Sequence, residues 1–117
     1  MKHAAILAAT LLAATFAVAE QKHGVEVYPN AKPDADVAKQ LEKMNIKNGA
    51  TYRSSDSATK VAEFYRKQSG LKEVGAGTDK GATFQGNKVM VTIQNPWLDM
   101  GTSKIVNDTL ISIVPGR

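Results

Sequence analysis

The sequence predicts an α+β protein: a single small domain in which an antiparallel β-sheet carries two α-helices packed on one face, preceded by a signal peptide. Three observations lead to this prediction. An apolar leader opens the chain, two helical apolar stripes follow it, and the second half shows the alternation of apolar and polar residues that is typical of strands. Helices that are followed by a run of strands are typical of the α+β class.

The first 19 residues have the three parts of a secretory signal peptide. Lys2 gives a positive start, residues 4–18 form an apolar run, and Ala17-Val18-Ala19 supplies small residues for signal peptidase. An uncleaved anchor is the alternative, but a membrane-spanning helix needs about 20 apolar residues and this run has about 15. We therefore expect a signal peptide over residues 1–19 and a single α+β domain over residues 20–117.

The composition limits the cellular compartments in which the protein could work and the kinds of chemistry that it could perform. The chain has no cysteine, which excludes disulfides, thiol catalysis, haem attachment through cysteine and a lipid anchor on an N-terminal cysteine. Loss of Lys2 with the leader leaves 14 of the 15 basic residues against 11 acidic ones, a net charge of +3. Because the basic residues are spread along the chain, we expect no nucleic acid partner. The leader predicts a periplasmic protein, or alternatively a secreted one, with no membrane span after cleavage.

The first elements of the mature chain lie between residues 20 and 44. Residues 20–24 are polar and are expected to fray. Residues 25–28 alternate and predict a short strand that Pro29 ends, and residues 29–33 are expected to form a turn that cannot continue a strand. Asp34 is a suitable N-cap for a helix over about residues 35–44. The expected buried stripe of this helix is Val37, Ala38, Leu41 and Met44.

The clearest helix follows a short strand at residues 50–53. Asp56 stands where an N-cap is expected, and three serines compete with it: Ser54, Ser55 and Ser57. Gly70 suits the left-handed residue that closes a helix, so the helix is expected to end near Ser69. Its predicted buried stripe is Ala58, Val61, Ala62, Phe64, Tyr65 and Gln68.

The second half predicts strands. Residues 71–74 form a short strand and residues 75–81 a loop. Residues 82–85 and 88–94 form a hairpin, with Gly86-Asn87 as its two-residue turn. One face of this hairpin is expected to carry Phe84, Val89, Val91 and Ile93, and the other Lys88, Met90, Thr92 and Gln94.

The last predicted strand covers residues 108–114. Thr109, Ile111 and Ile113 share one face, and Leu110 and Val114 share the other. Because both faces are apolar, this strand is expected to be covered on both sides and to lie centrally in the sheet.

No residue carries a recognisable catalytic, cofactor or metal-binding pattern. The glycine-rich residues 75–81 precede a strand and lack the order of a phosphate loop. His23 is the sole histidine after the leader, so no ordinary serine triad and no metal site are predicted. Asp99 and Asp108 form a candidate carboxylate pair, but their segment lacks the spacing of a calcium loop. A Ser–Lys pair cannot be recognised from spacing alone.

Residues 95–107 are the least regular part of the second half and are expected to form a long loop. This segment contains a candidate interaction patch of five residues: Pro96, Trp97, Leu98, Asp99 and Met100. Tryptophan is enriched in binding hot spots, which favours an exposed patch. The alternative is that Trp97 folds back as a lid over an open end of the core.

Several short motifs together resemble those of small exported bacterial α+β proteins of uncharacterised function. They are the turn Tyr28-Pro29-Asn30-Ala31, the helix start Ser55-Asp56-Ser57, the pairs Lys60-Val61 and Phe64-Tyr65, and a C-terminal pair of strands. The resemblance covers most of the mature chain and implies export and an α+β fold. It implies no activity.

Three hypotheses about function follow from these observations. The first is a non-enzymatic binding or interaction module of the bacterial envelope, with another envelope protein or a small ligand as its partner and no cofactor. The second is a small hydrolase that uses carboxylates or a Ser–Lys pair. The third is a structural subunit that pairs through an exposed sheet edge.

Overall fold

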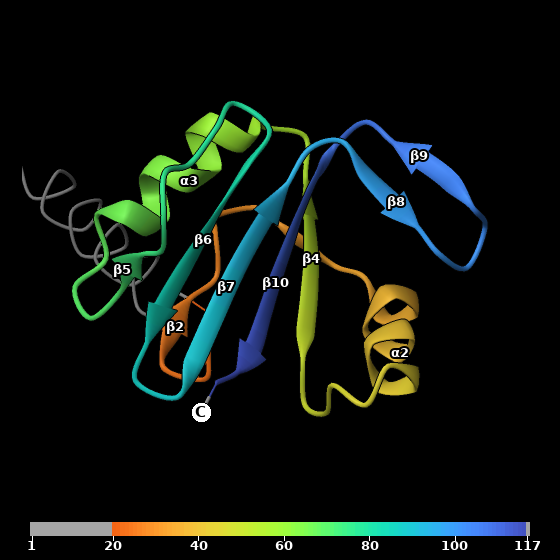
Figure 1. Ribbon diagram of the computed structural model, residues 1–117, viewed down its shortest axis with the longest axis horizontal. Coiled ribbons are helices and arrows are strands. Elements are labelled where there is room, and N and C mark those ends of the chain that lie inside the picture. Colours follow the sequence, from red (N-terminus) through yellow and green to blue (C-terminus); the bar gives the residue numbers. More distant parts are fainter. Residues whose placement is uncertain (1–19, 117) are drawn as a thin grey trace, which may run out of the picture.

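The computed structural model describes residues 20–116, and the expected signal peptide lies outside these residues. The described chain is a small α+β domain, as expected (Figure 1). Its helices are α2 (Ala35–Lys43) and α3 (Ala58–Arg66). Its strands are β1 (Gln21–Lys22), β2 (Val25–Glu26), β3 (Lys32–Pro33), β4 (Ala50–Ser54), β5 (Lys72–Glu73), β6 (Gly81–Gly86), β7 (Val89–Gln94), β8 (Trp97–Asp99), β9 (Lys104–Val106) and β10 (Thr109–Pro115). No helix in the described part of the chain is long and apolar enough to span a membrane.

Six strands form the main sheet, in the order β3-β4-β10-β7-β6-β5, and every neighbouring pair is antiparallel. Strand β10 lies between β4 and β7, which confirms the central position expected for it. Strand β3 was not expected, because its residues Lys32–Pro33 fall in the predicted turn. Proline is tolerated there because β3 is an edge strand and needs only one bonded side.

Helix α3 covers one face of the sheet and lies against β6 and β7. Its buried residues are Ala58, Val61, Ala62 and Tyr65, which confirms most of the predicted stripe. The N-cap is Ser57, whose hydroxyl accepts from the Lys60 N–H at 3.1 Å. Our first choice, Asp56, was therefore wrong. Its carboxylate accepts a 2.6 Å hydrogen bond from the Tyr28 hydroxyl and is not available to cap the helix.

The main core lies between α3 and this face of the sheet. Register pairs place Val91 of β7 between Phe84 of β6 and Ile113 of β10, and all three side chains are completely buried. The alternation expected for β7 is confirmed, since Val89, Val91 and Ile93 are buried, Met90 and Thr92 between them are partly exposed, and Gln94 is exposed. The remaining buried members are Val25, Val27, Tyr28, Tyr52, Ala58, Val61, Ala62, Tyr65, Ala82 and Ile111.

The hairpin turn lies one residue later than expected. Gly86 pairs with Val89, so the two turn residues are Asn87 and Lys88, and Lys88 has a φ of +59°. Gly86 belongs to β6, and a Cβ at this position would meet the carbonyl oxygen of Gly70 at 2.9 Å. The glycine is thus required for a close backbone approach, which local turn preferences do not reveal.

Helix α2 begins as predicted, with the Asp34 carboxylate accepting from the Val37 N–H at 3.1 Å. Val37 packs with Trp97 and Leu110 in a second, smaller cluster, which we call the small cluster. Leu110 and Ile111 are neighbours in β10 and point to opposite faces of the sheet. Helices α2 and α3 therefore pack on opposite faces of β10, whereas the sequence led us to expect one shared face.

The first described residues are ordered, although we expected them to fray. Strands β1 and β2 pair across a two-residue turn, His23-Gly24, in which both residues have positive φ (52° and 81°). The His23 Nε2 atom lies 2.7 Å from the Asn48 carbonyl oxygen. This contact and the β1–β2 pairing hold residues 21–26 against the domain.

Candidate functional site

Residues 95–107 contain a β-hairpin, so the prediction of a long irregular loop was wrong. Strands β8 and β9 are antiparallel, with Trp97 opposite Val106 and Leu98 opposite Ile105. The Asn95–Pro96 peptide bond before the hairpin is cis, and Pro96 is exposed. We call residues 97–106 the projecting hairpin, because it extends beyond the main sheet next to α2 (Figure 1).

Trp97 lies on the inner side of the projecting hairpin and is only 3% exposed. Its ring packs with Val37 and Leu110, and its Nε1–H donates to Asp108 Oδ1 at 2.7 Å. The guanidinium carbon of Arg53 lies 5.4 Å from the ring centroid, within the range of a cation–π contact. Trp97 is thus a buried residue that attaches the hairpin to the domain, and a partner cannot reach it.

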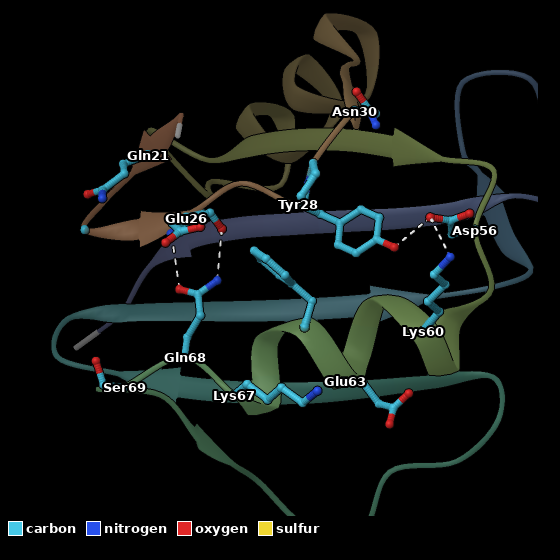
Figure 2. Close-up of a pocket in the computed structure, with 13 residues that line it drawn as sticks. Gln21, Glu26, Tyr28, Asn30, Asp56, Lys60, Glu63, Lys67, Gln68 and Ser69 are labelled. Carbon is cyan, nitrogen blue, oxygen red and sulfur yellow. Dashed lines mark hydrogen bonds and ion pairs between the residues drawn. The ribbon is translucent and has the colours of Figure 1, made fainter. Parts of the chain in front are cut away.

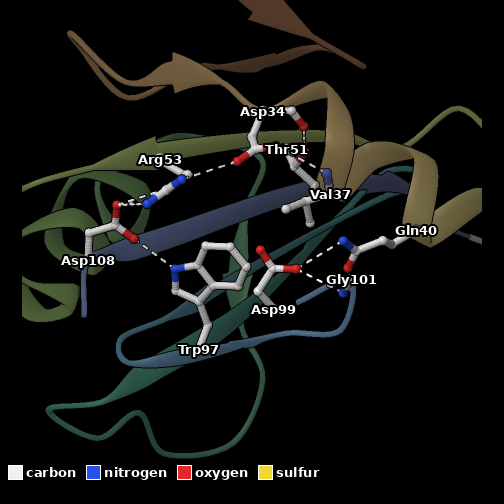
Figure 3. Close-up of polar contacts among 9 residues, drawn as sticks. All are labelled: Asp34, Val37, Gln40, Thr51, Arg53, Trp97, Asp99, Gly101 and Asp108. Carbon is white, nitrogen blue, oxygen red and sulfur yellow. Dashed lines mark hydrogen bonds and ion pairs between the residues drawn. The ribbon is translucent and has the colours of Figure 1, made fainter. Parts of the chain in front are cut away.

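Arg53 lies between two carboxylates in an arrangement that we call the Arg53 clamp. Its Nη2 is 2.8 Å from Asp108 Oδ2, and its Nη1 is 3.4 Å from Asp34 Oδ2 (Figure 3). The hydrogen bond to Asp108 raises the pKa of the Arg53 side chain above its ordinary value. Because Asp108 also accepts from Trp97, the clamp joins the start of α2, strand β4, the hairpin and the start of β10.

Asp99 has a similar structural role. Its Oδ1 accepts from Gln40 Nε2 at 3.0 Å and from the Gly101 N–H at 2.9 Å (Figure 3). The hydrogen bond from Gln40, followed by those from the hairpin turn, lowers the pKa of Asp99. Asp99 and Asp108 therefore bind different structural partners. Among residues 20–116, no group of three or more His, Cys, Asp or Glu side chains is placed to hold a metal ion.

The outer side of the projecting hairpin is apolar and exposed. Leu98 is 54% exposed, and Met100 and Ile105 are each 60% exposed. We call these three residues the exposed apolar face. Neighbouring residues of a strand point to opposite sides, so the burial of Trp97 itself turns Leu98 outward. Leu98 and Met100 were part of the patch predicted from the sequence, but Ile105 was not, because strands of three residues are too short to show alternation.

A second surface feature is an open groove of about 860 Å³ between α3 and residues 21–30 (Figure 2). Sequence reasoning missed it because its two walls come from segments that are about 40 residues apart. The lining residues are Gln21, Gly24, Glu26, Tyr28, Pro29, Asn30, Asp56, Lys60, Glu63, Phe64, Lys67, Gln68 and Ser69.

Side chains of α3, and of the residues just before and after α3, make most of the hydrogen bonds across the groove. The Gln68 amide accepts from the Glu26 N–H at 3.2 Å and donates to the Glu26 carbonyl at 3.3 Å. At the other end, the Tyr28 hydroxyl donates to Asp56, whose carboxylate lies 4.0 Å from Lys60 Nζ (Figure 2). Burial, together with the hydrogen bond to Asp56, raises the pKa of Tyr28 to about 12. The Tyr28 hydroxyl therefore stays protonated and acts as a donor.

Comparisons of the chain with protein-family models, with curated proteins and with solved structures found no match.

Proposed function

We propose that this protein is a non-enzymatic interaction module of the bacterial envelope, working in the periplasm, that binds another protein through the exposed apolar face of the projecting hairpin. The observation that carries this proposal is the placement of Leu98, Met100 and Ile105. These three large apolar side chains are each more than half exposed. Leu98 and Ile105 are paired across the two strands, and Met100 lies in the turn that joins them. Exposed apolar residues that gather on one surface mark interaction sites more often than single ones do.

The inner side of the hairpin supports this reading. Asp99 accepts from Gln40 of α2 at 3.0 Å, and Trp97 donates at 2.7 Å to Asp108, which precedes β10. Arg53 holds the same Asp108 at 2.8 Å. An attached ribbon presents its outer residues in one orientation, which reduces the conformational entropy lost on binding. The hairpin is therefore suited to the role of a preorganised contact surface.

The alternative of a small hydrolase has less support. An acid–base mechanism would need free carboxylates, but three of them already have structural partners. Asp34 caps the N-terminus of α2, Asp99 accepts from the hairpin turn, and Asp108 pairs with Arg53. The tyrosines with the largest pKa shifts, Tyr28 and Tyr65, owe them first to burial.

Site-specific photo-crosslinking in living cells tests this function. A photo-reactive amino acid at position 105 is expected to give one discrete adduct with an envelope protein. The matched control is position 74, because Val74 is 50% exposed and follows β5, at the opposite edge of the main sheet. Mass spectrometry of the adduct is also expected to show an N-terminus at Glu20, which tests export and cleavage.

The binding energy is tested with the double variant Leu98→Ser, Ile105→Ser. Each substitution removes an apolar side chain from the contact, so we expect the Kd for the crosslinked protein to rise at least about thirtyfold. Thermal stability is expected to change little, because both residues are exposed. An adduct that forms equally at position 74, or a Kd that the double variant leaves unchanged, would contradict the proposal.

A further inference from the structure

The outer edge of β2, which is the edge that faces away from β1, borders the groove. The Val27 N–H donates to the Glu20 carbonyl at 2.8 Å, so Val27 faces β1. Backbone groups of neighbouring residues in a strand point to opposite edges, so the N–H and C=O of Glu26 point away from β1. They point toward α3, where no strand lies beside them among the described residues.

Two side chains take the place of a neighbouring strand. One belongs to α3, and the other follows the C-terminal end of α3. The Tyr65 hydroxyl accepts from the Tyr28 N–H at 2.9 Å, and the Gln68 amide bonds both backbone groups of Glu26. Tyr65 is completely buried, whereas Gln68 is only partly buried at the groove. The bond to Tyr28 therefore belongs to the core, but the Gln68 amide can be displaced without disturbing it.

The dimensions of the groove suit a short extended chain. Lys60 and Arg66 are six residues apart in α3, which is about 9 Å at about 1.5 Å per residue, and Gln68 extends this wall by two residues beyond the helix end. An extended chain rises about 3.3 Å per residue, so this wall matches about four residues. The volume of about 860 Å³ lies within the range of ligand-binding sites.

The side chains of the groove indicate what such a chain would present. Phe64 lies midway along the wall and is partly exposed, with its ring fixed by edge-to-face contacts to Tyr28 at 5.3 Å and Tyr65 at 5.0 Å. Lys67 and Glu63 lie on the same wall, so the groove has no single sign of charge (Figure 2). Recognition by backbone hydrogen bonds and one apolar contact fits this surface better than recognition of a charged ligand.

We propose that the groove binds an extended peptide segment of about four residues by strand addition to β2. The peptide backbone replaces the Gln68 amide on the N–H and C=O of Glu26, and one apolar peptide side chain rests on Phe64. In strand addition, backbone hydrogen bonds contribute affinity and side-chain contacts contribute specificity. In the free protein, the Gln68 amide occupies the edge and protects it from indiscriminate pairing.

The test uses an array of acetylated and amidated heptapeptides with four randomised central positions. The peptide that binds best is expected to carry an apolar central residue, and to shift the nuclear magnetic resonance signals of the Glu26 N–H and the Gln68 side-chain amide. The same peptide with its pairing amide N-methylated keeps every side chain but loses the backbone donor. We expect N-methylation to weaken binding at least about tenfold.

Protein variants give a second, independent measurement. Gln68→Ala removes the competing amide, so we expect about a three- to tenfold lower Kd for the same peptide. Gln85→Ala is the matched control, because Gln85 is exposed on β6 and is not among the groove residues. Leu98→Ser, Ile105→Ser is expected to leave peptide binding unchanged, which separates the groove from the projecting hairpin. Binding that tolerates N-methylation, weaker binding by Gln68→Ala, or the absence of any peptide that shifts Glu26 would overturn the proposal.

Discussion

The two faces of the central strand β10 are stabilised in different ways. On the α3 face, fifteen buried residues form the main core, in which the completely buried side chains of Phe84, Val91 and Ile113 lie opposite one another on neighbouring strands. On the α2 face, only Val37, Trp97 and Leu110 are buried together. There the Arg53 clamp and the Trp97–Asp108 hydrogen bond supplement the apolar contact. A cluster of three residues buries too little apolar area to hold α2 and the projecting hairpin without polar bonds.

This difference implies a division of roles. The main core determines whether the domain folds, and the small cluster determines where the projecting hairpin is held. Substitutions on the two faces are therefore expected to differ in size and in what else they change.

The largest effect is expected in the main core. Tyr65→Ala removes a completely buried ring and leaves the Tyr28 N–H without its hydroxyl partner. We expect the free energy of unfolding to fall by about 3–5 kcal/mol, as measured by urea denaturation. Lys60→Ala is the control on the exposed side of α3 and is expected to change it by less than about 0.5 kcal/mol. Small effects of equal size at both positions would show that α3 does not carry the core.

An intermediate effect is expected in the small cluster. Trp97→Ala should lower the free energy of unfolding by about 2–4 kcal/mol, less than Tyr65→Ala, because the surrounding cluster is small and can collapse. Trp97→Phe keeps an aromatic ring but loses the Nε1 donor to Asp108, so we expect a loss of about 1–2 kcal/mol. Trp97 is the only tryptophan, so its fluorescence reports on this site alone. Blue-shifted emission that resists quenching is expected, whereas red-shifted, easily quenched emission would contradict the buried position.

The smallest effect at neutral pH is expected for Tyr28→Phe, which removes only the hydroxyl bonded to Asp56 and should cost about 1 kcal/mol. Its pH dependence is more informative. The pKa of Tyr28 is about 12 in the folded protein, against an ordinary value of 10.0. The hydroxyl therefore contributes its full stability below pH 10, and this contribution is lost as the pH rises to about 12.

The measurement is urea denaturation of wild type and Tyr28→Phe across this pH range. The burial of Tyr65 and Tyr52 also raises the pKa of each, so both proteins should lose stability at alkaline pH. The difference between the two proteins should nevertheless shrink between pH 10 and 12. A constant difference would mean that Tyr28 titrates normally and that its bond to Asp56 is weak.

The parts of the fold that the sequence predicted are those whose signal is local and long enough to read. Val61 and Tyr65 recur at helical spacing in α3, and Asp34 caps α2 by accepting from an N–H group only three residues away. In β10, Ile111 and Ile113 alternate with Ser112, and the apolar residues on both faces indicated a central strand. Each of these patterns is complete within about ten residues, so a single sequence contains it.

The candidate site was only partly predictable. The segment that contains Leu98 and Met100 was identified, but Trp97 and Asp99 were included in the same patch, although they point inward. Strands β8 and β9 have three residues each, which is too few to show the alternation that separates the two sides. Tertiary contacts, with Arg53, Asp108 and Gln40, decide which side of this hairpin is exposed.

The sequence by itself therefore determined the α+β class, the apolar faces of α3, β7 and β10, and the N-cap of α2, because neighbouring residues specify all of these. Only the tertiary structure decided that α2 lies on the opposite face from α3, that Ser57 caps α3 while Asp56 binds Tyr28, and that Gln68 closes the edge of β2. Each of these outcomes is a competition between a local partner and one that lies about 30 or more residues away. The contact with the distant partner can form only when the main core has brought the two segments together. A local sequence pattern therefore does not predict it.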